Sequence, residues 1–212
     1  MAGAQAHLAA WRPTLSRLAK WGIGVAALLP AVRIGRLALL DRLGPNPIES
    51  ALNRLGFWTL VLLLVTLSPT PLQRLTGWKW PLRLRRMLGL ETFLYACLHF
   101  TLYAVLDQGL DLGEIGRDII KRKFITVGLL ALLLLVPLAV TSTDGWVSRL
   151  GFKRWKRLHR LIYVAAALGV IHFAWRVKSD LSEPAVFGGA LAVLLAIRFF
   201  VRAPGGARRS SG

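Results

Sequence analysis

Six long apolar stretches constrain this chain more than any other feature of its sequence. Each approaches the length of about 20 mostly apolar residues that a helix needs to cross a lipid bilayer. They cover residues 21–40, 51–67, 87–106, 124–140, 158–175 and 184–201. The sequence therefore predicts an all-α fold, an integral membrane bundle of six transmembrane helices. We expect this domain to span 21–201, between an N-terminal segment, 1–20, and a flexible tail, 202–212.

The composition agrees with a membrane domain. Hydrophobic residues make up 55% of the chain and charged residues 18%, whereas soluble domains carry roughly 25% charged residues. A water-soluble enzyme and a disordered chain are both disfavoured, because disorder requires low hydrophobicity. The single cysteine, Cys97, excludes an internal disulfide, a cysteine-only iron–sulfur site and a covalent Cys-x-x-Cys-His haem site.

The net charge of +18 would suggest a nucleic-acid partner in a soluble protein. Here the basic residues lie in short loops at the ends of the apolar stretches, which is typical of loops that face anionic membrane lipids. If both termini lie on one side, that side holds about twice as many basic residues as the other. We therefore expect both termini in the cytoplasm and no nucleic-acid partner.

Histidines within the apolar stretches are the first candidates for chemistry, since an ionisable group inside a membrane is costly. At a rise of 1.5 Å per residue, His99 lies about 18 Å and His172 about 22 Å from the same membrane surface. Two facing helices can hold a cofactor between them, and histidine is the usual nitrogen ligand of haem iron. His99 and His172 are therefore predicted axial ligands of one haem iron. A packing or hydrogen-bonding role remains the alternative for each.

His159 is a separate candidate ligand near the start of the fifth apolar stretch. It lies about 3 Å from the cytoplasmic edge and about 19–20 Å from His172 along a helix, a separation that suits two stacked redox centres. On one continuous ideal helix, however, the two side chains would point about 140° apart. We expect His159 to be a second haem site or an auxiliary ligand. The alternative is a solvated side chain among its basic neighbours.

Other charged groups allow two interpretations. Glu91 lies two helical turns from His99 and is a candidate proton relay for quinol oxidation, or the ion-pair partner of a basic residue such as Arg54. Arginines of the second and fourth loops suit haem propionates or an anionic flavin. The alternative for most of them is anchoring at the membrane surface.

The residues around these histidines form a recognisable pattern. It consists of Trp155-Lys-Arg-Leu-His159, Tyr163, His172-Phe-Ala-Trp175, Arg85-Arg86, Gly89, Leu98-His99, Tyr103 and Thr141-Ser-Thr143. This pattern resembles the ferric-reductase-like transmembrane family over nearly the whole chain. Within that family it is most similar to the haem-binding membrane subunits of bacterial periplasmic methionine sulfoxide reductase systems.

The resemblance implies a six-helix b-type cytochrome of the bacterial inner membrane, with His99, His159 and His172 at the positions of the family's haem histidines. It implies one or two haem b groups. Electrons would pass from the quinone pool or a cytoplasmic flavin reductase to a periplasmic molybdopterin-containing sulfoxide reductase. The chain would then be an electron-transfer subunit with no catalytic residue of its own.

The chain departs from the wider family in three respects. Arg85 stands where a fourth histidine often occurs, which leaves a cytoplasmic haem without an obvious second ligand. FMN, associated with this subfamily, has no phosphate-binding loop here. The few residues after Val201 cannot form a flavin–nicotinamide domain, so we expect another molecule to be the electron donor.

Two other functions remain open. The first is a reductase of ferric chelates or other small substrates. The second, from a different class, is a haem-free transporter or assembly factor.

Overall fold

The computed structural model describes residues 2–177 and 180–201, with side chains from Leu18 onward, and all its regular elements are helical. The elements are α1 (Ala2–Leu39), α2 (Pro47–Leu67), α3 (Pro69–Thr76), η1 (Trp80–Leu84), α4 (Arg85–Leu102), η2 (Tyr103–Asp107), α5 (Leu112–Lys121), α6 (Lys123–Val140), α7 (Asp144–Leu150), α8 (Phe152–Leu158), α9 (Leu161–Val177) and α10 (Ser182–Phe200). Of these, η1 is a 3₁₀-helix and η2 is a π-helical turn.

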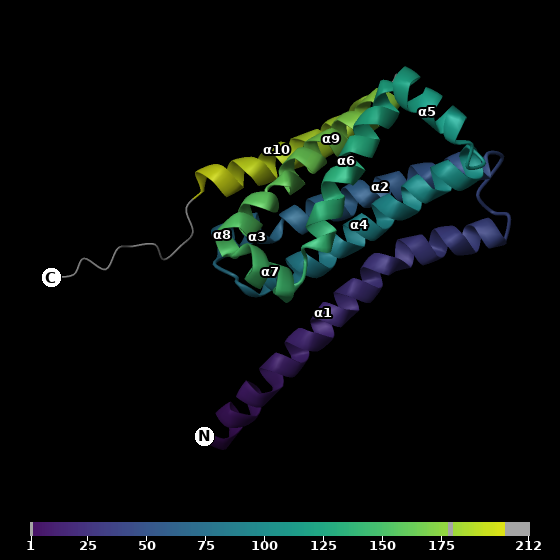
Figure 1. The fold of residues 1–212 in the computed structure, drawn as a ribbon. Helices are drawn as coiled ribbons and strands as arrows, with labels where there is room; N and C mark the ends of the chain where they lie inside the picture. The colour runs from purple at the N-terminus through teal and green to yellow at the C-terminus, as the bar shows by residue number, and fades with distance from the viewer. Residues whose placement is uncertain (1, 178–179, 202–212) are drawn as a thin grey trace.

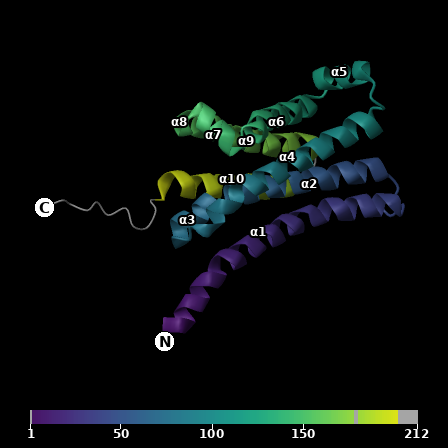
Figure 2. The same cartoon turned by 60° about the horizontal axis from the view of Figure 1, so that its bottom comes forward.

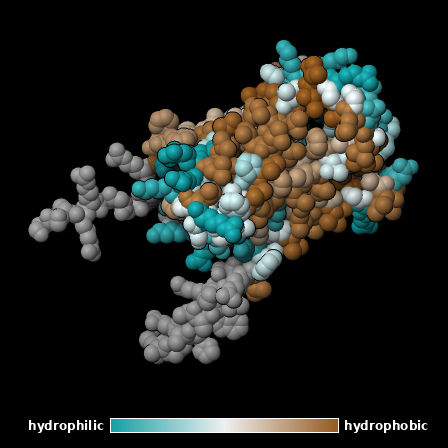
Figure 3. Space-filling view, in the orientation of Figure 1, coloured by the Kyte–Doolittle hydropathy of each residue, from teal (hydrophilic) through white to brown (hydrophobic). Residues whose placement is uncertain are grey.

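Six helical segments are long and apolar enough to cross a membrane. They are Leu18–Leu39, Pro47–Thr76, Trp80–Asp107, Lys123–Val140, Phe152–Val177 and Ser182–Phe200. Each overlaps one of the six stretches expected from the sequence, so the prediction of an all-α, six-span bundle is confirmed. Hydrophobic side chains cover the middle of the visible face, and hydrophilic ones gather at its two ends (Figure 3).

The bundle is built on two closely packed helix pairs, α2 with α4 and α6 with α9, while α10 lies beside α9 (Figures 1 and 2). Small residues allow the close approach of α9, because Ala165 and Ala166 are almost fully buried in the main apolar core. Small side chains at helix interfaces commonly allow such contact in membranes. Between α2 and α4, the hydroxyl groups of Thr66 and Thr92 share a 3.2 Å hydrogen bond.

Helix α1 lies on the outside, and its N-terminal part diverges from the bundle (Figure 2). The fully buried Tyr95 of α4 holds the rest of α1 against the bundle. The Tyr95 hydroxyl donates to the carbonyl of Ala27 and accepts from the N–H of Ala31, at 2.7 and 2.9 Å. These two groups would otherwise bond to each other along the helix. Pro30, which has no N–H, disturbs the same turn, so a bend in α1 here has a local cause.

The two ends of the bundle differ in charge. The basic end, as we call it, comprises α3, η1, the start of α4, α7 and α8. The end of α10 lies there, and the start of α1 points to the same side of the molecule but lies away from the bundle (Figure 1). The opposite end carries α5 and the turn between α1 and α2. Both ends of the described chain therefore lie on one side of the bundle. The predicted tail, 202–212, lies outside the described residues.

The fifth span differs from the continuous helix assumed from the sequence. Helix α8 ends at Leu158 and α9 begins at Leu161, with a tight turn over His159 and Arg160 between them. The N–H of Arg160 bonds to the carbonyl of Arg157, and the N–H of Tyr163 to that of Arg160, both three residues back. The angle of about 140° between His159 and His172 holds for one ideal helix, and it does not apply to a span that is interrupted by this turn.

Candidate functional site

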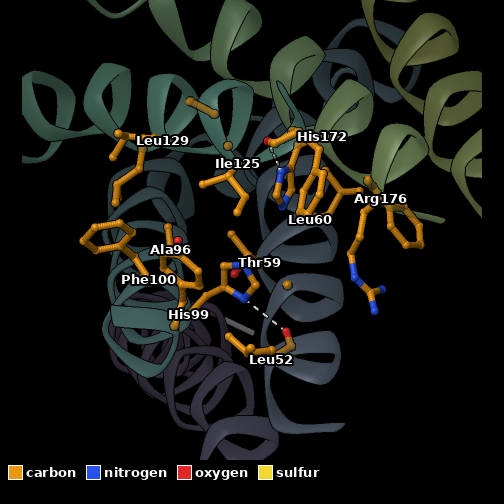
Figure 4. Close-up of a pocket in the computed structure, with 18 of the residues that line it drawn as sticks. Leu52, Thr59, Leu60, Ala96, His99, Phe100, Ile125, Leu129, His172 and Arg176 are labelled. Carbon is orange, nitrogen blue, oxygen red and sulfur yellow. Dashed lines mark hydrogen bonds between the residues drawn. The ribbon is translucent and has the colours of Figure 1, made fainter. Parts of the chain in front are cut away.

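His99 and His172 meet inside the bundle. His99 projects from the last turn of α4 and His172 from α9, and their rings point toward each other across a cavity (Figure 4). The ring centroids are 6.2 Å apart, and the ring planes are nearly perpendicular, at 82°. The two side chains thus come together, as their similar depths predicted, and their role as ligands stays a prediction.

Main-chain carbonyl groups hold both rings. The Nδ1 atom of His99 lies 3.0 Å from the carbonyl oxygen of Leu52 on α2, and that of His172 lies 2.7 Å from the carbonyl oxygen of Phe124 on α6. A carbonyl oxygen can only accept, so each Nδ1 must carry the proton and donate it. In a neutral ring the lone pair then lies on Nε2. This is the arrangement in which proteins present histidine to a metal.

Each ring also rests against a glycine one turn beyond the carbonyl that it contacts. A Cβ atom at Gly128 would lie 2.7 Å from Nδ1 of His172, and one at Gly56 would lie 3.2 Å from Cε1 of His99. Any larger residue at Gly128 would collide with the imidazole. The two glycines therefore make the space in which the rings lie.

The cavity around the rings has a volume of about 390 Å³, within the range of roughly 300–1,000 Å³ typical of cofactor sites. Its wall is mainly apolar and comes from α2, α4, α6 and α9. A metal ion between two imidazoles lies about 2 Å from each coordinating nitrogen, and the 6.2 Å between ring centroids leaves that space. The donor set, its tautomers and the apolar wall thus fit a haem iron.

Charged side chains line the cavity toward the opposite end of the bundle. Arg122 and Arg176 both border it. Arg122 pairs with Asp118 at 3.1 Å, while Arg176 makes a longer contact of 3.4 Å with Glu49. Guanidinium groups suit planar carboxylates, so these two arginines are available to the propionates of a group held by the histidines.

His159 lies elsewhere, at the basic end. Its Nε2 atom is 3.0 Å from the hydroxyl of Thr141, which itself donates to the carbonyl of Pro137 at 2.6 Å. The single hydroxyl proton is thus used, so Nε2 of His159 must be the donor. The Trp155 indole packs against the ring, with centroids 4.0 Å apart and planes tilted by 30°, and its N–H bonds to the carbonyl of Thr141. His159 faces no second histidine in the described part of the chain, and its ligand role stays a prediction.

Glu91 does not make the ion pair that was one of its two expected roles. Among the described residues no ion pair joins it to Arg54. Its Oε2 atom is buried without a hydrogen-bond partner there, and its Oε1 atom would lie 3.1 Å from a Cβ at Gly24 of α1. The side chain therefore faces α1, because Gly24 leaves room for it.

Sequence reasoning missed the groups that fix the rings. The carbonyl groups of Leu52 and Phe124 have no side-chain signal at all. Gly56 and Gly128 do offer a signal, since an isolated glycine in an apolar helix often marks a close approach. Thr141 stood in the recognised pattern, but its contact with His159 depends on the turn that ends α8.

Comparison with known proteins agrees with this geometry. Residues 54–170 match the model of the ferric reductase like transmembrane component family. A relative from Rhodospirillum rubrum is 54% identical over 92% of this chain and 93% of its own length. A second, from Herminiimonas arsenicoxydans, is 52% identical over 89% and 87%. Both are named protein-methionine-sulfoxide reductase heme-binding subunit MsrQ. The chain belongs to the MsrQ family.

A third MsrQ relative, from Azospira oryzae, is 47% identical over 91% of this chain. The names describe these relatives as haem-binding subunits of a methionine sulfoxide reductase system. MsrQ membership therefore agrees with the cavity, whose two histidines have the chemistry that haem iron requires.

Proposed function

We propose that this chain is a b-type cytochrome of the bacterial inner membrane that serves as the electron-transfer subunit of a methionine sulfoxide reductase system. His99 and His172 would hold the haem iron, and Arg122 and Arg176 would pair with its propionates. The observation that carries the proposal is the facing pair of imidazoles, each with Nδ1 bound to a carbonyl and Nε2 left for a metal.

The bound haem would supply one-electron redox chemistry in the membrane. The chain's own residues would orient the ligands, exclude water and set the charge around the site. The carbonyl groups of Leu52 and Phe124 fix the tautomer of each ring, which raises its basicity toward iron. The mainly apolar wall would limit the access of water to the ligands, and Arg122 and Arg176 border the cavity together with the acids Glu49 and Asp107.

The direction of transfer follows from the proposed orientation, with the basic end in the cytoplasm. The pair His99 and His172 would then lie toward the periplasm, where a molybdopterin-containing sulfoxide reductase would accept electrons. The quinone pool or a cytoplasmic flavin reductase would be the donor. FMN has no glycine-rich phosphate loop in this sequence, so the proposal does not require it. His159 remains the candidate for any second haem.

The deciding experiment is a reduced-minus-oxidised absorbance spectrum of the purified protein. We expect the bands of a low-spin, bis-histidine haem, and their reoxidation when the purified periplasmic reductase is added. Reoxidation by ferric chelates alone would favour the small-substrate reductase. A colourless protein with no difference spectrum would contradict the proposal and favour a haem-free transporter or assembly factor.

A further inference from the structure

Four arginines from separate elements converge at the basic end of the bundle. Arg74 lies near the end of α3, Arg85 begins α4, Arg160 lies in the turn before α9, and Arg198 is in the last turn of α10. The other three arginines all lie within electrostatic range of the guanidinium group of Arg198. Side chains far apart in sequence are therefore gathered into one positively charged cluster.

This cluster has no acidic partner in the described structure. Residues 68–90, 141–160 and 191–201 contain a single acid, Asp144, and that carboxylate pairs with Arg86 at 2.8 Å. Like charges held together repel one another, most strongly where they are removed from water. No carboxylate of the described residues therefore neutralises the four guanidinium groups.

Burial separates the cluster from ordinary basic residues at a membrane surface. Arg74, Arg85 and Arg198 are all partly buried, whereas their neighbours Arg83, Arg86, Lys153, Arg154, Lys156 and Arg157 are exposed. A charge that only anchors the protein in lipid headgroups has no need of burial. The cluster thus forms a recessed site with Arg160, which is exposed, at its rim.

Arg198 supplies the most direct sign of a missing ligand. Its guanidinium group lies over the ring of Tyr163, 4.9 Å from the centroid. Its Nη1 atom is buried and has no hydrogen-bond partner among the described residues. A buried donor left without a partner is costly. Arg74 is fixed beside it, because its Nη1 donates to the carbonyl of Val201 at 2.6 Å.

We propose that Arg74, Arg85, Arg160 and Arg198 form a binding site for a phosphate group. Guanidinium forks bind phosphate oxygens through paired, charge-assisted hydrogen bonds. Arg74 and Arg198 lie in the last turns of α3 and α10, Arg85 begins α4 and Arg160 directly precedes α9. All four therefore lie at helix ends on one side of the bundle, where phospholipid headgroups are found. Basic pockets between helices at this depth bind acidic headgroups. The phosphate comes from an anionic phospholipid or from a free phosphate in the adjoining solution.

The experiment measures phosphate ligands on the purified full-length protein. Phospholipid retained in detergent is quantified by mass spectrometry. Thermal stability is then recorded with added cardiolipin, phosphatidylglycerol or phosphatidylcholine, and separately with inorganic phosphate against chloride at equal ionic strength. The variants are R198Q and R160Q, with K153Q as the control, because Lys153 is an exposed cation of the same end. R160Q alters an exposed side chain, so the test survives if R198Q fails to fold.

We expect R198Q and R160Q to retain about tenfold less anionic lipid, as the loss of one charge-assisted hydrogen bond implies, and K153Q to match the parent. Stabilisation by inorganic phosphate without selective lipid retention would support the site and assign it to free phosphate. Equal ligand responses in all variants would overturn the proposal. A fall in haem content with an unchanged lipid and phosphate response would also overturn it, since the arginines would then serve haem carboxylates near His159.

Discussion

The membrane histidines of this chain are held in two contrasting ways. His99 and His172 each donate from Nδ1 to a main-chain carbonyl, and their rings face each other across an apolar cavity. His159 donates from Nε2 to the Thr141 hydroxyl and lies under the Trp155 indole. The first pair keeps the metal-binding nitrogen available, whereas the second arrangement uses it. A histidine near a membrane span is therefore not defined by its depth alone; the partner of each ring nitrogen decides what it can bind.

The largest expected effect comes from removing either member of the facing pair. His99→Ala or His172→Ala should abolish most of the haem absorbance of the purified protein, because the haem iron would lose one of its two proposed ligands. His159→Ala, the matched change at the other region, should leave most of it. A full low-spin spectrum in both His99→Ala and His172→Ala would contradict the assignment of these two histidines as the ligands and of His159 as the contrasting case.

A methyl group at Gly128 tests the shape of the cavity rather than its ligands. The added Cβ would meet His172 Nδ1 at 2.7 Å, so Gly128→Ala should destabilise the protein by about 1–3 kcal/mol and lower its haem content. Gly35→Ala is the control, since nothing lies within 4 Å of a Cβ there. Haem-to-protein ratios and thermal unfolding give the two readouts. Equal behaviour of the two variants would mean that α6 can move away from α9 freely.

The hydroxyl of Thr141 accepts the hydrogen bond from His159. Thr141→Val should cost about 1 kcal/mol of stability, because Nε2 of His159 loses its acceptor, while the haem spectrum stays unchanged. Ser142→Ala provides the control, because the Ser142 hydroxyl donates to the carbonyl of Leu138 and has no bond to His159 among the described residues. Loss of haem on Thr141→Val would show instead that the two regions act together.

The smallest expected effect concerns Arg176. Its contact with Glu49 is exposed and long, so Arg176→Gln should hardly change stability. Removing a positive charge beside a haem favours its oxidised state, and a redox titration should show a lower midpoint potential. Lys121→Gln, an exposed change at the same end, should leave the potential near that of the parent.

Sequence reasoning found the six spans because each apolar run is long enough to cross a bilayer, a condition that tertiary contacts cannot change. It also placed His99 and His172 at similar depths along their helices, since the rise of a helix per residue is constant. It could not find the turn at His159 and Arg160, because nothing in that basic segment breaks a helix by composition. Nor could it find that Glu91 faces α1 through Gly24, since that depends on how α1 packs against α4.

The close contact of the two histidine rings with Gly56 and Gly128 limits how the cavity could be redesigned. Whoever wishes to enlarge the redox chamber or admit a different macrocycle cannot do so by exchanging ligands alone. The space around the two rings depends on the distance between the packed helices. The distance from α2 to α4 and the distance from α6 to α9 would therefore both have to increase.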